Sequence, residues 1–250
     1  MPVRCGSVLQ GRFEPMDGLD DFPTPPWATR SVVEHVIAGL DGGGLADLRQ
    51  QEVWEPACGR GHMASVLQGY FGRVMASDVA DYSMLETAGP AYRGQTRVMD
   101  FTCPHSVPRR IEKAGVDWII TNPPYNLGAH FVERALDLKP RRGVAMLVRL
   151  AFLEGLKRHA GIFSVRPPAI IAQFVERVPM YRARLSGKGS TATAYCWLVW
   201  RTDIRANDTR FFWIPRSRRA LELDGDYPDV TSAEFEQQQL KFQRDERRRR

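Results

Sequence analysis

Four polar residues recur along the chain at nearly constant intervals, and each one closes a short run of strand-forming residues. Glu55, Asp78, Asp100 and Asn122 are separated by 23, 22 and 22 residues. This interval is typical of consecutive strand–helix units, in which each helix returns the chain to the same edge of a parallel sheet. The sequence therefore predicts an α/β fold whose strand ends meet at one rim, where open parallel sheets bind ligands.

The first strand end opens into a glycine turn, Glu55-Pro56-Ala57-Cys58-Gly59-Arg60-Gly61, which a helical pattern over residues 63–71 follows. Glycine lets the backbone turn sharply and approach a ligand closely. The third glycine of the dinucleotide-binding pattern is missing, which disfavours a nicotinamide dehydrogenase. Asp78 lies where an acidic side chain can bind ribose hydroxyls. Asp100 can hydrogen-bond an adenine amino group while Phe101 packs against the ring, so the pattern predicts a nucleoside-containing cofactor.

The fourth strand end carries the tetrapeptide Asn122-Pro123-Pro124-Tyr125 after the apolar run of residues 116–120. Neither proline has an N–H, so the local backbone offers mostly carbonyl oxygens, and the Asn122 side chain adds another acceptor. Tyr125 adds a flat aromatic face. Two acceptors beside an aromatic ring suit a planar NH2 group and would favour its attack on a methyl donor. We predict that these four residues are catalytic; a turn that merely closes the strand is the simpler alternative.

Together these motifs resemble the class I S-adenosylmethionine-dependent methyltransferases, in particular the DNA methyltransferases that modify N6 of adenine. The resemblance covers roughly residues 21–200 and includes a Thr-Pro-Pro element within residues 21–29. The order of this element, the glycine turn and the tetrapeptide is similar to the gamma arrangement of that family. Small phage-associated adenine methyltransferases are the nearest analogy.

The resemblance implies S-adenosylmethionine as the cofactor and duplex DNA as the partner, with the target adenine flipped out of the helix. It also implies that Thr24 contacts the methionine end of the cofactor, although Thr24 could instead only N-cap the following helix. Packing is the alternative role for Cys58, because no activating base is evident near it. The predicted cofactor contacts are Thr24, Pro25, Glu55, Pro56, Ala57, Cys58, Gly59, Gly61, Asp78, Val79, Asp100, Phe101 and Asn122.

The expected fold is a Rossmann-like, mostly parallel seven-stranded sheet with a reversed last strand and helices on both faces. Strand patterns over residues 144–149, 170–176 and 193–200 would complete this sheet. We expect a leader at residues 1–20, a catalytic domain at residues 21–200 and an extension at residues 201–250 that ends in a basic tail. Residues 149–154, after the fifth strand, are expected to help line the base pocket.

Charge is distributed unevenly along the chain. Residues 139–219 carry 17 basic and 4 acidic residues, whereas residues 1–138 carry 12 and 17. A basic half that begins after the tetrapeptide suits a polyanionic substrate, although a solvated basic face is the simpler alternative. Within a basic, glycine-containing loop at residues 178–190, we expect Arg182, Arg184 and Lys188 to bind nucleic acid.

Composition limits the remaining possibilities. The four cysteines are scattered and the lone Cys103-x-His105 pair offers too few ligands, so we expect no metal. No apolar run approaches the roughly 18 residues of a membrane span, so we expect no membrane association and a cytoplasmic location. The predicted function is adenine-specific DNA methylation. An RNA amino-methyltransferase, a protein glutamine N5-methyltransferase and a non-catalytic nucleic-acid-binding module are the alternatives, and the oligomeric state stays open.

Overall fold

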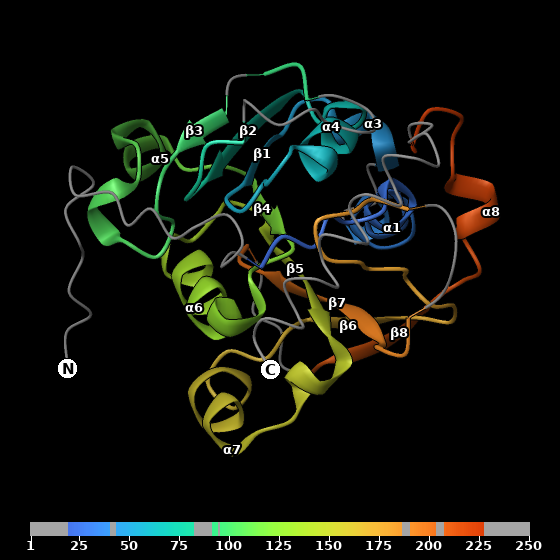
Figure 1. The fold of residues 1–250 in the computed structure, drawn as a ribbon. Coiled ribbons are helices and arrows are strands. Elements are labelled where there is room, and N and C mark those ends of the chain that lie inside the picture. The colour runs from blue at the N-terminus through green and yellow to red at the C-terminus, as the bar shows by residue number, and fades with distance from the viewer. Residues whose placement is uncertain are drawn as a thin grey trace, which may run out of the picture.

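An eight-stranded sheet runs through the molecule, with helices packed on both faces (Figure 1). The computed structural model describes residues 20–40, 44–82, 92–94, 96–186, 191–203 and 208–227; residues 1–19, Lys188 and the basic tail lie outside them. The strands are β1 (Glu52–Glu55), β2 (Arg73–Asp78), β3 (Thr96–Val98), β4 (Trp118–Thr121), β5 (Gly143–Arg149), β6 (Ile170–Phe174), β7 (Tyr195–Arg201) and β8 (Arg210–Ile214).

The helical segments that connect these strands are mostly short. The α-helices are α1 (Pro26–Val32), α2 (Ala38–Leu40), α3 (Gly44–Leu48), α4 (His62–Gln68), α5 (Arg109–Ala114), α6 (Gly128–Asp137), α7 (Leu156–Arg158) and α8 (Arg218–Leu221). The tighter or wider turns are η2 (Val33–Ile37), η3 (Pro104–Ser106), η4 (Tyr125–Leu127), η5 (Leu150–Leu153) and η6 (His159–Phe163). Helix α1, η2 and α2 follow one another without a break. Among the described residues, no helix is both long and apolar enough to cross a membrane.

The strand order is β3-β2-β1-β4-β5-β7-β6-β8, and only β7 runs antiparallel to its neighbours. The predicted α/β class, the mostly parallel sheet and the reversed strand are therefore confirmed. The sheet has eight strands rather than seven, because β8 follows the reversed strand and pairs in parallel with β6. Residues 211–214 of this edge strand are a continuous apolar run, although Phe211 and Trp213 are exposed.

Side chains of the strands alternate between two apolar cores, as the two-residue period of a strand requires. On one face, Trp118 and Ile120 pack with α1 and α4. On the other face, Ile119 packs with α6. Both cores are continuous along the sheet, which holds the strand ends in fixed positions.

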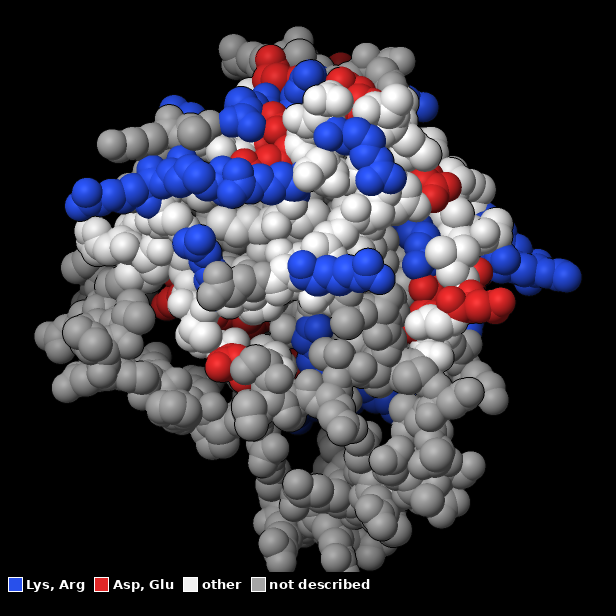
Figure 2. All heavy atoms as spheres, turned by 90° about the horizontal axis from the view of Figure 1, so that it is seen from above, with Lys and Arg blue, Asp and Glu red and all other residues white. Residues whose placement is uncertain are grey.

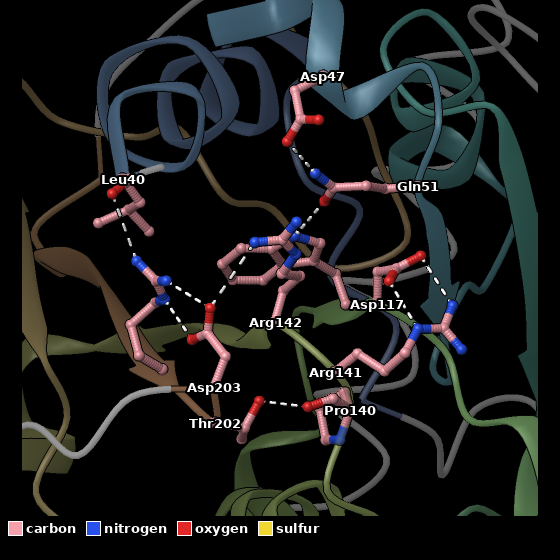
Figure 3. A network of polar contacts seen from close by, with 11 residues as sticks. Leu40, Asp47, Gln51, Asp117, Pro140, Arg141, Arg142, Thr202 and Asp203 are labelled. Atoms are coloured by element: carbon pink, nitrogen blue, oxygen red, sulfur yellow. Dashed lines mark hydrogen bonds and ion pairs between the residues drawn. The ribbon is translucent and has the colours of Figure 1, made fainter. Parts of the chain in front are cut away.

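A network of polar contacts ties together the amino ends of the central strands (Figure 3). The Asp117 carboxylate accepts hydrogen bonds from the Glu52 N–H at 2.7 Å and from the Arg141 guanidinium at 2.8 and 2.9 Å. Nearby, Asp203 pairs with Arg201 at 2.7 Å and with Arg142 at 3.9 Å. This network lies at the opposite end of the sheet from the predicted site.

Candidate active site

The parallel strands bring the predicted site residues to one rim. Strand β1 pairs in parallel with both β2 and β4, and β4 pairs in parallel with β5. Glu55, Asp78, Asn122 and Arg149 therefore lie at neighbouring carboxyl ends of the sheet. This is the common rim that the 22- to 23-residue spacing predicted.

The glycine turn is fastened to the end of β2. The Gly59 N–H donates a 2.8 Å hydrogen bond to Asp78 Oδ2, and the Ala80 N–H donates to Oδ1 at 3.2 Å. Gly59 and Gly61 have φ angles of 50° and 83°, in the left-handed region that glycine adopts without strain. A Cβ at Gly59 would meet nothing within 4 Å, so this side of the turn is open.

Two carboxyl groups are buried beneath this turn. Burial, and then the charge of Asp78, raise the pKa of Glu55 well above its usual value. Burial also raises the pKa of Asp78 to about 6, against the hydrogen bonds from the Gly59 and Ala80 N–H groups. The Ala64 N–H donates to the Glu55 carboxylate, but Glu55 Oε2 is buried without a hydrogen-bond partner among the described residues.

These features fit a nucleoside-containing cofactor. An unpartnered buried oxygen such as Glu55 Oε2 calls for a donor that the described residues do not provide. The Asp78 carboxylate accepts backbone hydrogen bonds from Gly59, Ala80 and Val79, which still leaves a lone pair that a hydroxyl group could use. The open side of Gly59 allows a ligand to approach the backbone. Within the described part of the chain, no three His, Cys, Asp or Glu residues are placed to hold a metal ion.

The other residues in and near the turn that were predicted to contact the cofactor differ in their exposure to solvent. Pro56 and Cys58 are buried, Ala57 is half-buried, and Val79 is exposed. The Cys58 N–H donates to the Ser77 carbonyl at 3.0 Å, and burial raises the pKa of the Cys58 thiol, which keeps it neutral. The structure thus places Cys58 in the body of the turn, where it packs against its neighbours.

Asp100 and Phe101, which follow β3, differ in burial: Asp100 lies at the surface and Phe101 lies in the core. Asp100 is exposed, and its Oδ1 accepts hydrogen bonds from the N–H and the hydroxyl of Thr102, at 2.9 and 2.7 Å. The Phe101 ring is buried, with its centroid 5.1 Å from Trp54 and 4.9 Å from Phe131. Phe101 therefore packs inside the fold, while Asp100 lies at the surface.

The N-terminal segment, residues 20–25, lies across the rim. The Phe22 carbonyl accepts a 2.9 Å hydrogen bond from Asn122, and Asp21 pairs with Arg60 at 3.1 Å. Thr24 and Pro25 are both buried. Pro25 occupies the N-cap of α1 and no side chain caps this helix, so Thr24 does not serve as the cap.

The tetrapeptide begins at the end of β4 and is held from two sides. A carbonyl can only accept a hydrogen bond, so the Phe22 carbonyl fixes the Asn122 amide with its nitrogen on that side. Asn122 Oδ1 then faces away, and it is buried without a partner among the described residues. Pro123 is buried, and Pro124 is half-buried and starts the η4 turn. The end of the strand therefore holds at a fixed position a buried acceptor to which no described residue donates.

Tyr125 is fixed by its hydroxyl group and covered by a cation. Its hydroxyl lies 3.0 Å from that of Tyr195, and burial raises the pKa of Tyr125, which keeps the hydroxyl protonated. The guanidinium carbon of Arg149 lies 3.6 Å from the centroid of the Tyr125 ring. Residues 149–154 were expected to help line the base pocket. Of these, Arg149 is the last residue of β5, and it contacts the Tyr125 ring directly.

Sequence reasoning missed three other residues of this rim. Tyr195 comes from β7, and nothing in the sequence connects it with Tyr125. Arg60 lies within the glycine turn and His62 follows it, but the motif does not require arginine or histidine at these positions. Burial, and then the charge of Arg60, lower the pKa of His62 to about 4, so the ring is neutral near pH 7.

The basic residues of the second half serve more than one purpose. Arg141, Arg142 and Arg201 form ion pairs at the amino ends of the strands, away from the rim. In the predicted nucleic-acid loop, Arg182 is exposed and the Arg184 guanidinium lies 4.7 Å from the Tyr181 ring. Figure 2 shows Lys and Arg side chains spread over one face, with Asp and Glu side chains between them. That face therefore carries a mixed rather than an uninterrupted basic surface.

Solved structures of similar fold include a modification subunit of a putative type I restriction enzyme from Vibrio vulnificus. It is 16% identical, with a TM-score of 0.52, over 90% of this chain and 53% of that one. A type I restriction-modification methyltransferase subunit from Streptococcus thermophilus is 11% identical, with a TM-score of 0.54, over 87% of this chain and 52% of that one. A DrdV–DNA complex is 15% identical, with a TM-score of 0.51, over 81% of this chain and 28% of that one.

These similarities confirm the predicted Rossmann-like fold of class I methyltransferases, and at such low identity they show the fold alone. The chain spans about half the length of the two subunits that it matches. No protein-family model and no curated protein sequence matches the chain.

Proposed function

We propose that this chain is an S-adenosylmethionine-dependent methyltransferase that modifies the N6 amino group of adenine in DNA. The observation that carries the proposal is the fixed Asn122 amide, whose Oδ1 is a buried acceptor without a partner among the described residues. This unpartnered oxygen could accept a hydrogen bond from one N–H of a planar amino group. The fold supports the reaction class, because the similar structures include methyltransferase and modification subunits.

Two predicted groups at the rim would bind the cofactor. Asp78 would accept a hydrogen bond from a ribose hydroxyl through the lone pair that its backbone contacts leave free. The open side of Gly59 would let the cofactor lie against the turn. When bound, S-adenosylmethionine supplies an electrophilic methyl group.

The chain's own residues would prepare the amine for attack. Asn122 Oδ1 and the Pro123 carbonyl would each accept one N–H hydrogen of the adenine amine. These hydrogen bonds strengthen as positive charge develops on nitrogen, so they favour the transition state. Tyr125 would hold the base by stacking. No general base is needed, since the extra proton can leave the nitrogen once the new N–C bond has formed.

DNA as the substrate rests on separate observations. The basic second half retains exposed Arg177 and Arg182 even though other arginines are ion-paired. Among the proteins of similar fold, DrdV was solved in complex with DNA, and the restriction-modification enzyme LlaBIII was solved bound to DNA. The gamma-like order and the phage analogy stay predictions.

Nucleoside mass spectrometry tests this proposal. Purified protein is incubated with S-adenosylmethionine and unmethylated DNA or RNA, beside the variants Asn122→Ala and Asn126→Ala. Asn126 is an exposed asparagine of the same loop and serves as the matched control. We expect N6-methyladenine in DNA from the wild type and Asn126→Ala, but at least a hundredfold less from Asn122→Ala. Methylation of RNA alone would refute DNA as the substrate, and equal activity of both variants would refute the role of Asn122.

A further inference from the structure

Arg149 covers the aromatic face that a target base would use. It is the last residue of β5, its side chain is exposed, and its guanidinium carbon lies 3.6 Å from the Tyr125 ring centroid. Such a short distance from the centroid is possible only above the ring face, where one planar group stacks on another. No carboxylate among the described residues pairs with Arg149. Its side chain lies over the Tyr125 ring and also hydrogen-bonds the Tyr125 hydroxyl group.

The surroundings of Tyr125 leave little freedom for a different arrangement. The Phe22 centroid lies 4.9 Å from that of Tyr125, and the Arg149 guanidinium carbon lies 5.9 Å from Phe22. These distances, with the 3.6 Å contact, form nearly a right angle at Tyr125. Phe22 therefore lies beside the ring and Arg149 lies over it. The hydrogen bond with Tyr195 fixes the hydroxyl end of Tyr125, and the neighbouring Phe22 ring hinders rotation of the Tyr125 ring about its long axis.

A guanidinium and a purine are both flat and both stack on tyrosine. They cannot occupy the same face together at van der Waals distance. The free energies of a cation–π contact and of base stacking are similar in size, so one group can replace the other. Tyr125 belongs to the same tetrapeptide as Asn122, whose Oδ1 is a buried acceptor without a partner among the described residues, so the competing ligand is a base with an amino group rather than a general aromatic compound.

We propose that Arg149 occupies the place of the target base against Tyr125 and must leave it when the base enters. This inference rests on the proposed function. Arg149 is then a specificity-determining residue, because a base must gain more from stacking and from hydrogen bonds at Asn122 than the guanidinium loses. A base that stacks but cannot offer an amino group to Asn122 competes less well with Arg149.

Binding of 2-aminopurine riboside, followed by quenching of its fluorescence, tests the competition. This nucleoside has no phosphate that could attract Arg149. Saturating S-adenosylhomocysteine is present so that the probe does not enter the cofactor site. We expect Arg149→Ala to bind the probe about threefold to tenfold more tightly than the wild type, because the ring face is uncovered. Arg149→Lys, which keeps the charge but lacks the flat group, should give an intermediate gain.

Two controls define the result. Arg210→Ala removes an arginine that lies 5.7 Å from the Phe212 ring on the distant edge strand, and it should leave probe binding unchanged. Adding Tyr125→Ala to Arg149→Ala should abolish the gain. Thermal unfolding of each variant verifies that it is folded.

Weaker or unchanged probe binding by Arg149→Ala would overturn the inference, and so would the absence of probe binding by every variant. Methyl transfer to DNA, measured in parallel, separates this failure from failure of the proposed function. Transfer by the wild type without a gain for Arg149→Ala would reject only the role of Arg149. Absence of transfer by all variants would reject the proposed function itself.

Discussion

Replacing Asp78 with asparagine should stabilise the fold while weakening cofactor binding. Burial raises the pKa of Asp78 from 3.8 to about 6, so the folded chain holds this proton more tightly than the unfolded chain. The difference of about two pKa units corresponds to about 3 kcal/mol of destabilisation at pH 7. This loss of stability is absent below about pH 4, where both states are protonated, and it develops as the pH rises to about 6.

Asparagine cannot ionise, so Asp78→Asn removes this pH-dependent loss. It also leaves a backbone N–H group, such as that of Gly59 or Ala80, without an acceptor, which costs about 1 kcal/mol. The net gain at pH 7 is about 2 kcal/mol, or about 4–8 °C in Tm for a chain of this size. The gain should disappear near pH 4.

Circular dichroism during heating, at pH values from 4 to 8, measures this gain, and isothermal titration with S-adenosylmethionine measures the affinity. We expect at least a tenfold loss of affinity for Asp78→Asn, because a charged acceptor is lost. Wild-type affinity should fall about tenfold at pH 5, where about a tenth of Asp78 is ionised. Asp137→Asn changes an exposed ion-paired carboxylate and is the matched control. A lower Tm for Asp78→Asn at pH 7, or an equal gain at every pH, would refute the reasoning.

Three other substitutions test separate parts of the structure. Asp117→Ala removes both hydrogen bonds to Arg141 and should lower the free energy of unfolding in urea by about 3 kcal/mol, with cofactor affinity unchanged. Gly59→Val places a branched side chain at a φ of 50°, so stability should fall by about 1–2 kcal/mol and titrated cofactor affinity by more than tenfold. Tyr125→Phe keeps the ring and should retain methyl transfer within about fivefold, whereas Tyr125→Ala should lose at least about tenfold in a radiolabelled-methyl assay.

The sequence predicted the parallel half of the sheet because its signals are local. Glu55 and Asp78 are the last residues of β1 and β2, Asn122 directly follows β4, and the Gly59 turn follows β1 as expected. Spacing alone therefore identified the rim. The carboxyl groups of Glu55 and Asp78 could be placed on this rim because parallel strands have their carboxyl ends at the same edge of the sheet.

Contacts between distant segments could not be predicted in this way. Phe22, Arg149 and Tyr195 surround Tyr125, but they come from the N-terminal segment, β5 and β7. No periodicity links them, since packing rather than local pattern brings them together. Strand β8 was missed although residues 211–214 form an apolar run, because so short a run does not by itself distinguish a strand from a helix.

The burial of α1 has a consequence for synthesis of the chain. The Trp27 side chain of this helix is fully buried, and the Ala28 carbonyl accepts a 3.2 Å hydrogen bond from Trp197, 169 residues later. At about 5–20 residues per second, roughly ten to thirty seconds pass between translation of the two segments. During this time the apolar side of α1 lacks its final partner on β7. Although α1 is among the first helices to leave the ribosome, its packing is completed only when β7 has been made.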